Sequence, residues 1–171
     1  MIAVLGSINM DLVTEVAQLP RAGETVIGKS FARYPGGKGG NQAVAAARMG
    51  VKVAFFGKVG DDPFGEELLQ SLRRDRVDVQ AVQCETRIPS GSASILVAGN
   101  GENMIACTPG ANGLVDADYI DRVLPEIATA KVLLLQFETP IETLAYLLKR
   151  LPKEGPLVIL DPAPAQDLSP L

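Results

Sequence analysis

Histidine is absent from the 171 residues of this chain, and cysteine occurs only twice, at Cys84 and Cys107. Without histidine there is no Ser-His-Asp triad and no Cys-His dyad, and transition-metal sites lose their commonest ligand. The two cysteines lack CxxC spacing and lie in apolar or strand-like surroundings. We therefore expect two free, buried thiols in a reducing compartment, and we expect no metal site built from these residues.

Long apolar runs and blocks of like charge are also missing. No apolar segment approaches the length of a membrane span, and the N-terminus MIAVLGSINMD lacks the basic region of a signal peptide. The net charge of −4, from 16 basic and 20 acidic residues, argues against a sequence-independent nucleic-acid binder. These absences predict a cytoplasmic protein that binds neither membranes nor nucleic acid.

The residues that are present suffice for one α/β domain. Hydrophobic residues make up 47% of the chain, enough for a sizeable core in a domain of ordinary length. Continuous apolar runs alternate with helical patterns, which indicates a parallel sheet covered by helices on both faces. We expect buried strands at 1–5, 51–56, 131–137 and 156–160, a short strand near 77–83, and helices at 41–49, 63–75, 117–128 and 140–151.

Three helix ends carry capping signals. Asp62 followed by proline predicts an aspartate N-cap with proline at the first helical position. The run Thr139-Pro140-Ile141-Glu142 predicts a capping box, again with proline at the first helical position. Gly50 is predicted to end the first helix.

Four strand-like segments have a polar pattern that does not fit the buried sheet. Residues 12–16 and 25–34 flank the turn signal LPRAGE, and residues 92–98 and 103–108 are joined by GNGE, a hairpin signal. They predict a small second sheet inserted between the layers, followed by a loop at 109–113.

Ligands of open α/β sheets bind beyond the carboxyl ends of the strands. Asn9, Asp11, Glu138, Asp161 and a glycine loop are predicted to lie there. Asn9 and Asp11 are two residues apart and share one side of an extended chain, so their amide and carboxylate can bind neighbouring hydroxyls. A capping or turn role for this pair, and a purely dipole-favoured position for Glu138 at a helix start, stay open.

The glycine loop lies in PGGKGGNQAVAAARMG, residues 35–50, and matches neither nucleotide fingerprint. Lys38 is followed by Gly39 rather than serine or threonine, and Gln42 occupies the third glycine position of GxGxxG. The N–H groups of Gly39 to Asn41, at a helix start, favour an oxygen-rich ligand. A phosphate, a polyhydroxyl ligand and a plain strand-to-helix turn all remain possible from these residues.

Seven segments follow one another along the chain: GSINMD (6–11), LPRAGETV (19–26), GGKGGNQAVAAARMG (36–50), GKVGDDPFGE (57–66), PGAN (109–112), LLQFETP (134–140) and DPAPA (161–165). In this order they resemble the ribokinases of the PfkB carbohydrate kinase family over the whole chain. The resemblance implies a ribokinase-like α/β fold over residues 1–171, with lid strands at about 12–34 and 92–108.

The resemblance also implies residue roles. The residues that correspond to ribose contacts are Asn9, Asp11, Gly37, Lys38, Asn41 and Glu138. Ala93, Ile95 and Cys107 correspond to apolar lid positions over the sugar. The paired glycines at 36–37 would act as a hinge for lid closure, and the lid would join two subunits into a homodimer.

The activity implied is transfer of the γ-phosphoryl group of ATP, with Mg²⁺ and a monovalent cation such as K⁺, to the primary hydroxyl of D-ribose. The family's second signature, a glycine-rich segment that ends in the catalytic aspartate, has no counterpart in these residues. We therefore expect sugar contacts without a catalytic residue, and an open apolar edge where the C-terminal part of the fold is missing. A non-catalytic sugar-binding or dimerising fragment, a fructokinase and a nucleoside kinase of the same superfamily are the alternatives.

Overall fold

A four-stranded parallel sheet forms the body of the protein. A computed structural model describes residues 1–167 and 169, so the other three residues of the expected 1–171 domain lie outside the description. The strand order is β10-β9-β1-β4. The strands are β1 (Ile2–Leu5), β4 (Val53–Phe56), β9 (Val132–Gln136) and β10 (Leu157–Asp161). The expected α/β class with a parallel sheet is confirmed, and exposed Leu157 and Ile159 mark the apolar edge at β10.

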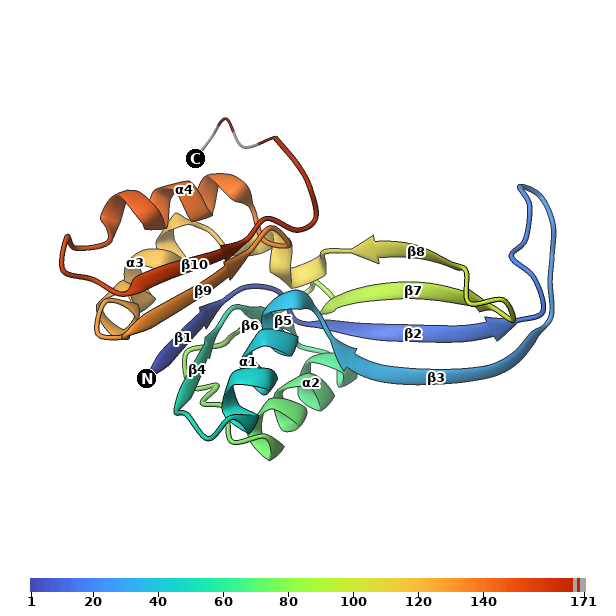
Figure 1. Cartoon of the computed structure of the whole chain (residues 1–171), viewed down its shortest axis with the longest axis horizontal. Helices are drawn as coiled ribbons and strands as arrows, with labels where there is room; N and C mark the ends of the chain where they lie inside the picture. The colour runs from blue at the N-terminus through green and yellow to red at the C-terminus, as the bar shows by residue number, and fades with distance from the viewer. Residues whose placement is uncertain (168, 170–171) are drawn as a thin grey trace.

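Helices cover both faces of this sheet (Figure 1). They are α1 (Lys38–Arg48), α2 (Pro63–Arg74), α3 (Ala117–Ile127) and α4 (Ile141–Arg150). Successive side chains of a strand point to opposite faces, so Val4 and Phe55 pack with α1 and α2 while Leu5 and Phe56 pack with α3 and α4. This alternation explains why β1 and β4 are apolar at every position and why β9 and β10 are apolar up to their last residues, Gln136 and Asp161.

The predicted second sheet is present, but it extends from the body as a long arm rather than lying between the layers (Figure 1). It has the order β3-β2-β7-β8, and we call it the lid sheet. Its strands are β2 (Asn9–Val16), β3 (Gly28–Gly36), β7 (Gly91–Ala98) and β8 (Asn103–Thr108). The first begins three residues before the expected 12–16, and β3 is shifted toward its carboxyl end from the expected 25–34. The hairpin at GNGE is confirmed, with the Ala98 N–H donating to the Glu102 carbonyl.

Two short elements differ from the sequence prediction. The strand expected at 77–83 is wrong apart from one bridge between Ala54 and Asp78, because the chain turns between Val79 and Val82. Pairing resumes at β6 (Gln83–Glu85), which lies parallel to an unexpected strand, β5 (Lys58–Gly60). The loop expected at 109–113 is largely a 3₁₀ helix, η1 (Gly110–Leu114).

The capping predictions have mixed outcomes. Asp62 caps α2 as expected, accepting a hydrogen bond of 2.7 Å from the Gly65 N–H. Gly50 follows α1 with a φ of +85°, a conformation that favours glycine. The capping box at 139–142 is wrong, because Pro140 itself is the N-cap residue, with ψ of 127°, and the side chain of Thr139 makes no capping bond.

The two cysteines are free but exposed, so the expectation of burial is wrong. Cys84 lies on the three-residue strand β6, and Cys107 lies on β8, an outer strand of the lid sheet. Within residues 1–167 and 169, no helix combines the length and apolar character needed to cross a membrane.

Candidate functional site

The carboxyl ends of β1 and β9 bring three segments together. These strands are hydrogen-bonded neighbours, so the residues after Leu5 lie beside the residues after Gln136. The chain leaving β1 passes through Ser7 into the lid strand β2, and the chain leaving β9 passes through Glu138. The start of α1 at Lys38 approaches both, which places the glycine loop at this edge of the body.

Glu138 accepts hydrogen bonds from the start of α1. Its Oε2 accepts from the Ser7 hydroxyl and, at 3.0 Å, from the Lys38 N–H. The Gly39 N–H donates to the Ser7 Oγ at 3.5 Å, and the Gly40 N–H donates to the Ser7 carbonyl at 2.8 Å. A carboxylate at a helix N-terminus is electrostatically favoured, so Glu138 itself supplies the negative charge that this helix end attracts.

The expectation that the N–H groups of residues 39–41 face an oxygen-rich ligand is therefore wrong. All three donate within the protein, that of Asn41 to the Gly37 carbonyl at 2.9 Å. Gly37 has a φ of +84°, and a Cβ there would lie 2.7 Å from the Ile8 Cα. The loop is a tight strand-to-helix turn packed against the segment after β1, and it offers side chains rather than backbone groups to a ligand.

A pocket of about 490 Å³ opens where these segments meet the lid sheet. Four residues singled out from the sequence line it: Asn9, Lys38, Cys107 and Glu138. The rest of its wall is formed by Thr108, Pro109, Asn112, Gly113, Phe137, Thr139, Pro140 and Pro164. Carboxylate, amide and ammonium groups thus meet a partly apolar wall, the combination typical of a small-molecule site.

Asp11 lies next to this group. Burial raises the pKa of Asp11, and the neighbouring Glu138 carboxylate raises the same pKa further. A Cβ on Gly36 would collide with the Asp11 carboxylate, so this glycine leaves room for it. The two carboxylates are therefore near enough to interact electrostatically.

Ala93 and Cys107 lie in register with Asp11 across the lid sheet, so the three side chains share one face. Burial raises the pKa of the Cys107 thiol, Glu138 and Asp11 raise it further, and Lys38 lowers it. Ala93 is buried beside them. This face of the lid therefore presents a small apolar surface next to the carboxylates.

Other predicted residues lie farther from the pocket. Ile95 shares the face of Ala93 but lies two residues farther along β7, in register with Val13. Asn41 is exposed and lines a separate hollow of about 260 Å³ beside Gly36. Asp161 ends the edge strand β10 and does not line the pocket.

Sequence reasoning missed Ser7, Asn112 and Thr139. Asn112 is 1% exposed and hydrogen bonds to both backbone groups of Ile8 and to the Asn9 side chain. Thr139 lines the pocket, and its buried Oγ1 has no hydrogen-bond partner among the described residues. The available signal for Asn112 was its place in PGAN, an amide among small residues in a predicted loop.

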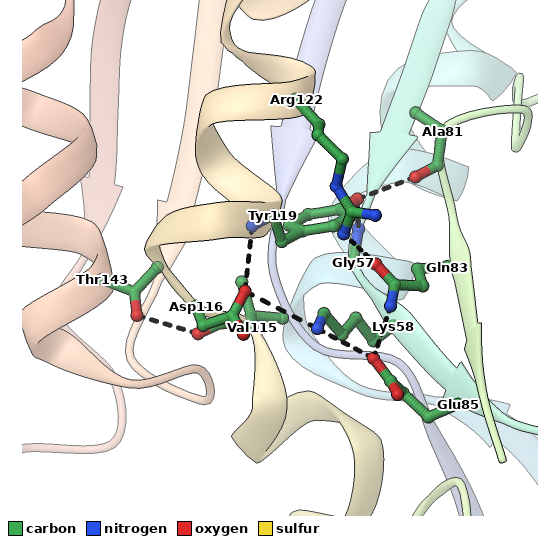
Figure 2. A network of polar contacts seen from close by, with 10 residues as sticks. All are labelled: Gly57, Lys58, Ala81, Gln83, Glu85, Val115, Asp116, Tyr119, Arg122 and Thr143. Atoms are coloured by element: carbon green, nitrogen blue, oxygen red, sulfur yellow. Dashed lines mark hydrogen bonds and ion pairs between the residues drawn. The ribbon is translucent and has the colours of Figure 1, made fainter.

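A second polar network lies around the start of α3 (Figure 2). Lys58 is 3% exposed and forms ion pairs with Glu85 at 2.8 Å and Asp116 at 3.7 Å. The Tyr119 hydroxyl accepts from the Gly57 N–H at 2.7 Å, and burial raises the pKa of this tyrosine. Because Asp116 caps α3 directly after η1, this network fixes the segment that carries the buried amide of the pocket wall.

No group of three or more His, Cys, Asp or Glu side chains in the described part of the chain is placed to hold a metal ion. The glycine loop also donates its helix-start N–H groups internally. The chemistry available here is hydrogen bonding to a polar ligand, with carboxylates as acceptors and Asn9 and Lys38 as side-chain donors.

Comparisons with known proteins identify the family of this chain. Residues 1–171 match the pfkB family of carbohydrate kinases. The chain is 42% identical to a ribokinase of Bacillus subtilis over 98% of its own length and 57% of that protein. Among solved structures, it superimposes on the ribokinase of Thermotoga maritima with a TM-score of 0.88 at 35% identity, covering 97% of this chain and 54% of that one.

A ribokinase of Arabidopsis thaliana, solved in complex with ribose and ATP, matches with a TM-score of 0.82 at 32% identity. The match covers 95% of this chain and 53% of that structure. The chain therefore spans about half the length of the relatives it matches.

Proposed function

The chain belongs to the pfkB family of carbohydrate kinases, and from that premise we propose that it is the sugar-binding N-terminal part of an ATP-dependent ribokinase. The complete enzyme would transfer the γ-phosphoryl group of ATP to the primary hydroxyl of D-ribose, giving D-ribose 5-phosphate and ADP. The observation that carries this proposal is the convergence of Asn9, Lys38 and Glu138 on one pocket, with the Asp11 carboxylate beside them.

A pentose presents hydroxyl groups that both donate and accept, and the pocket offers partners for both. Asp11 and Glu138 accept from sugar hydroxyls, and a hydrogen bond to a carboxylate is stronger than one between neutral groups. Lys38 and Asn9 donate through their side chains. Glu138 holds α1 through Oε2, which leaves Oε1 for the sugar.

The apolar side of the sugar ring would rest on the lid sheet. Ala93 and Cys107 share the face of Asp11, and Ile95 would reach the sugar when the lid closes over it. The glycines at 36–37 join β3 to α1, so a change of backbone angles there would move the lid relative to the body. Closure would bring Gly37 and Asn41 toward the sugar and exclude water from it.

ATP, Mg²⁺ and a monovalent cation such as K⁺ would bind residues from the other half of a full-length relative. The supporting observation is that the chain covers 57% of the Bacillus subtilis ribokinase. On this proposal the 171-residue chain binds sugar without transferring a phosphoryl group. A cytoplasmic location, where ATP is available, belongs to the same proposal.

A homodimer formed through the lid sheet is also proposed. Phe31 and Met104, 62% and 51% exposed, lie in one row across the sheet, and Ile105, 56% exposed, lies on the opposite face. Exposed apolar groups of this size favour association. Sedimentation equilibrium should show a dimer. One variant replaces Phe31 and Met104 by serine, another replaces Ile105 by serine, and the dimer should be lost in the variant whose face forms the interface. Persistence of the dimer in both variants would contradict a lid interface.

Isothermal titration calorimetry tests the sugar assignment. D-Ribose should bind the purified chain more tightly than D-fructose or adenosine, and addition of ATP with Mg²⁺ should yield no ribose 5-phosphate. Tighter binding of adenosine would favour a nucleoside kinase. Formation of ribose 5-phosphate by the chain alone would contradict the proposed absence of catalytic residues.

A further inference from the structure

A buried amide in the pocket wall contacts another polar residue of the pocket. Asn112, in η1, accepts a hydrogen bond of 3.0 Å from the Ile8 N–H through its Oδ1. Its Nδ2 donates to the Ile8 carbonyl at 3.1 Å and to the Asn9 Oδ1 at 2.7 Å. This side chain therefore joins η1 to the first residues of the lid strand β2.

The chemistry of these groups allows only one orientation of the two amides. A backbone N–H only donates, so the Ile8 N–H requires the oxygen of Asn112. The NH₂ group of Asn112 must then face Asn9, and because an NH₂ group also only donates, Asn9 must present its oxygen in return. The Ile8 backbone N–H thus fixes the direction of the hydrogen bonds that run from Ile8 through Asn112 to Asn9.

The orientation leaves the NH₂ group of Asn9 for the pocket. Asn9 lines the pocket, and within residues 1–167 and 169 no group accepts a hydrogen bond from its Nδ2. A Cβ on Gly91 would collide with both the Asn112 Nδ2 and the Asn9 Oδ1. The glycine therefore provides the space in which the two amides meet.

We propose that Asn112 is a positioning residue that fixes Asn9 as a hydrogen-bond donor toward the ligand. This inference rests on the proposed sugar-binding function, and it specifies the direction of the hydrogen bond between Asn9 and the sugar. Asp11 and Glu138 accept, whereas Asn9 donates, so a sugar hydroxyl at Asn9 accepts from the amide and keeps its own proton for a carboxylate. Asn112 thereby makes the pocket select a hydroxyl in one orientation through its effect on Asn9.

Side-chain amide NMR tests the orientation in the absence of sugar. The chain contains five asparagines, so a sample labelled with ¹⁵N-asparagine gives five NH₂ pairs, and the Asn9→Asp and Asn112→Asp variants assign two of them. The NH₂ protons of Asn112 should be protected from exchange with water, and those of Asn9 should exchange rapidly. Protection of the Asn9 pair in the free wild-type protein would overturn the proposal.

The Asn112→Asp variant should reverse the polarity of Asn9. A carboxylate at position 112 has no proton to donate, so Asn9 should turn its NH₂ group toward it and become protected from exchange. D-Ribose should then bind at least tenfold more weakly than to wild type, whereas Asn103→Asp, an exposed asparagine on β8, should bind D-ribose as wild type does. An unprotected Asn9 pair together with unchanged affinity would overturn the proposal.

A second variant covers the case in which Asn112→Asp does not fold. Gly91→Ala removes no polar group but places a methyl between the two amides, so it should expose the Asn112 NH₂ protons to exchange and weaken ribose binding. In wild type, added D-ribose should shift the Asn9 NH₂ signals and protect them. If the free protein shows the expected amide pattern and D-ribose changes nothing, the positioning role stands and the proposed sugar-binding function fails.

Discussion

Replacing Asp11 by asparagine should separate sugar affinity from fold stability. Within the described part of the chain, the Asp11 side chain makes no hydrogen bond or ion pair, and burial together with Glu138 raises its pKa. Loss of the charge therefore breaks no contact in the folded protein. The carboxylate is held in an environment that disfavours its ionised form, which is typical of a group kept for a ligand.

The expected magnitudes follow from these contacts. A hydrogen bond to a charged group contributes about 1.5–3 kcal/mol, so Asp11→Asn should weaken D-ribose binding by roughly 10- to 150-fold, and Asp11→Ala should abolish it. The free energy of unfolding should stay the same or increase at pH 7. The folded protein binds the proton of Asp11 more tightly than the unfolded chain does, because the pKa of Asp11 is raised in the folded state. The contribution of Asp11 to wild-type stability therefore falls as the pH rises above 3.8, the ordinary pKa of this side chain.

Calorimetric titration with D-ribose and urea unfolding at several pH values from 4 to 7 measure the two effects. The variant should lack the loss of stability that Asp11 causes in wild type as pH rises. Two results would refute the reasoning. One is a variant that binds ribose within threefold of wild type, and the other is a variant destabilised by more than about 1 kcal/mol, since a group without folded-state contacts has little to lose.

Three further variants test the packing around the site. Gly37→Ala should lower the thermal unfolding temperature more than Gly50→Ala does. Both glycines have a positive φ, but only a Cβ at position 37 would lie 2.7 Å from the Ile8 Cα. Equal decreases in unfolding temperature would contradict the packing of the loop. Glu85→Gln should lower the free energy of unfolding in urea by about 3 kcal/mol, because it leaves the buried Lys58 ammonium without its nearest partner. Lys58→Met should lower it by less. The reverse order would contradict the ion pair. D-Ribose should slow maleimide labelling of Cys107 and leave the other exposed thiol unaffected, as measured by mass spectrometry; equal protection would place the sugar elsewhere.

Local patterns predicted the body sheet well because its chemistry is local. Asp62 and its proline cap α2 with groups three residues apart, and the apolar run at Val53–Phe56 is buried on both faces of the sheet. The capping box at Thr139 failed because Pro140 adopts an extended ψ, so the helix starts one residue later than the sequence motif requires. That choice depends on how the chain leaves β9 rather than on the four residues of the motif.

The site was less accessible to sequence reasoning because its contacts join distant segments. Glu138 reaches the Lys38 N–H across 100 residues, and this contact decides that the glycine loop is closed to an anion. Asn112 reaches Ile8 across 104 residues, and no local pattern marks that pairing. Residue types predicted the composition of the pocket, whereas the directions of its hydrogen bonds required the fold.

A ¹H–¹⁵N NMR titration of the 171-residue chain with D-ribose tests the central proposal most directly. The account predicts that the largest shifts fall on Asn9, Asp11, Lys38, Cys107 and Glu138, and that Asp11→Ala abolishes them at the same sugar concentration. Shifts confined to the hollow beside Gly36, or no shifts at saturating D-ribose, would contradict it.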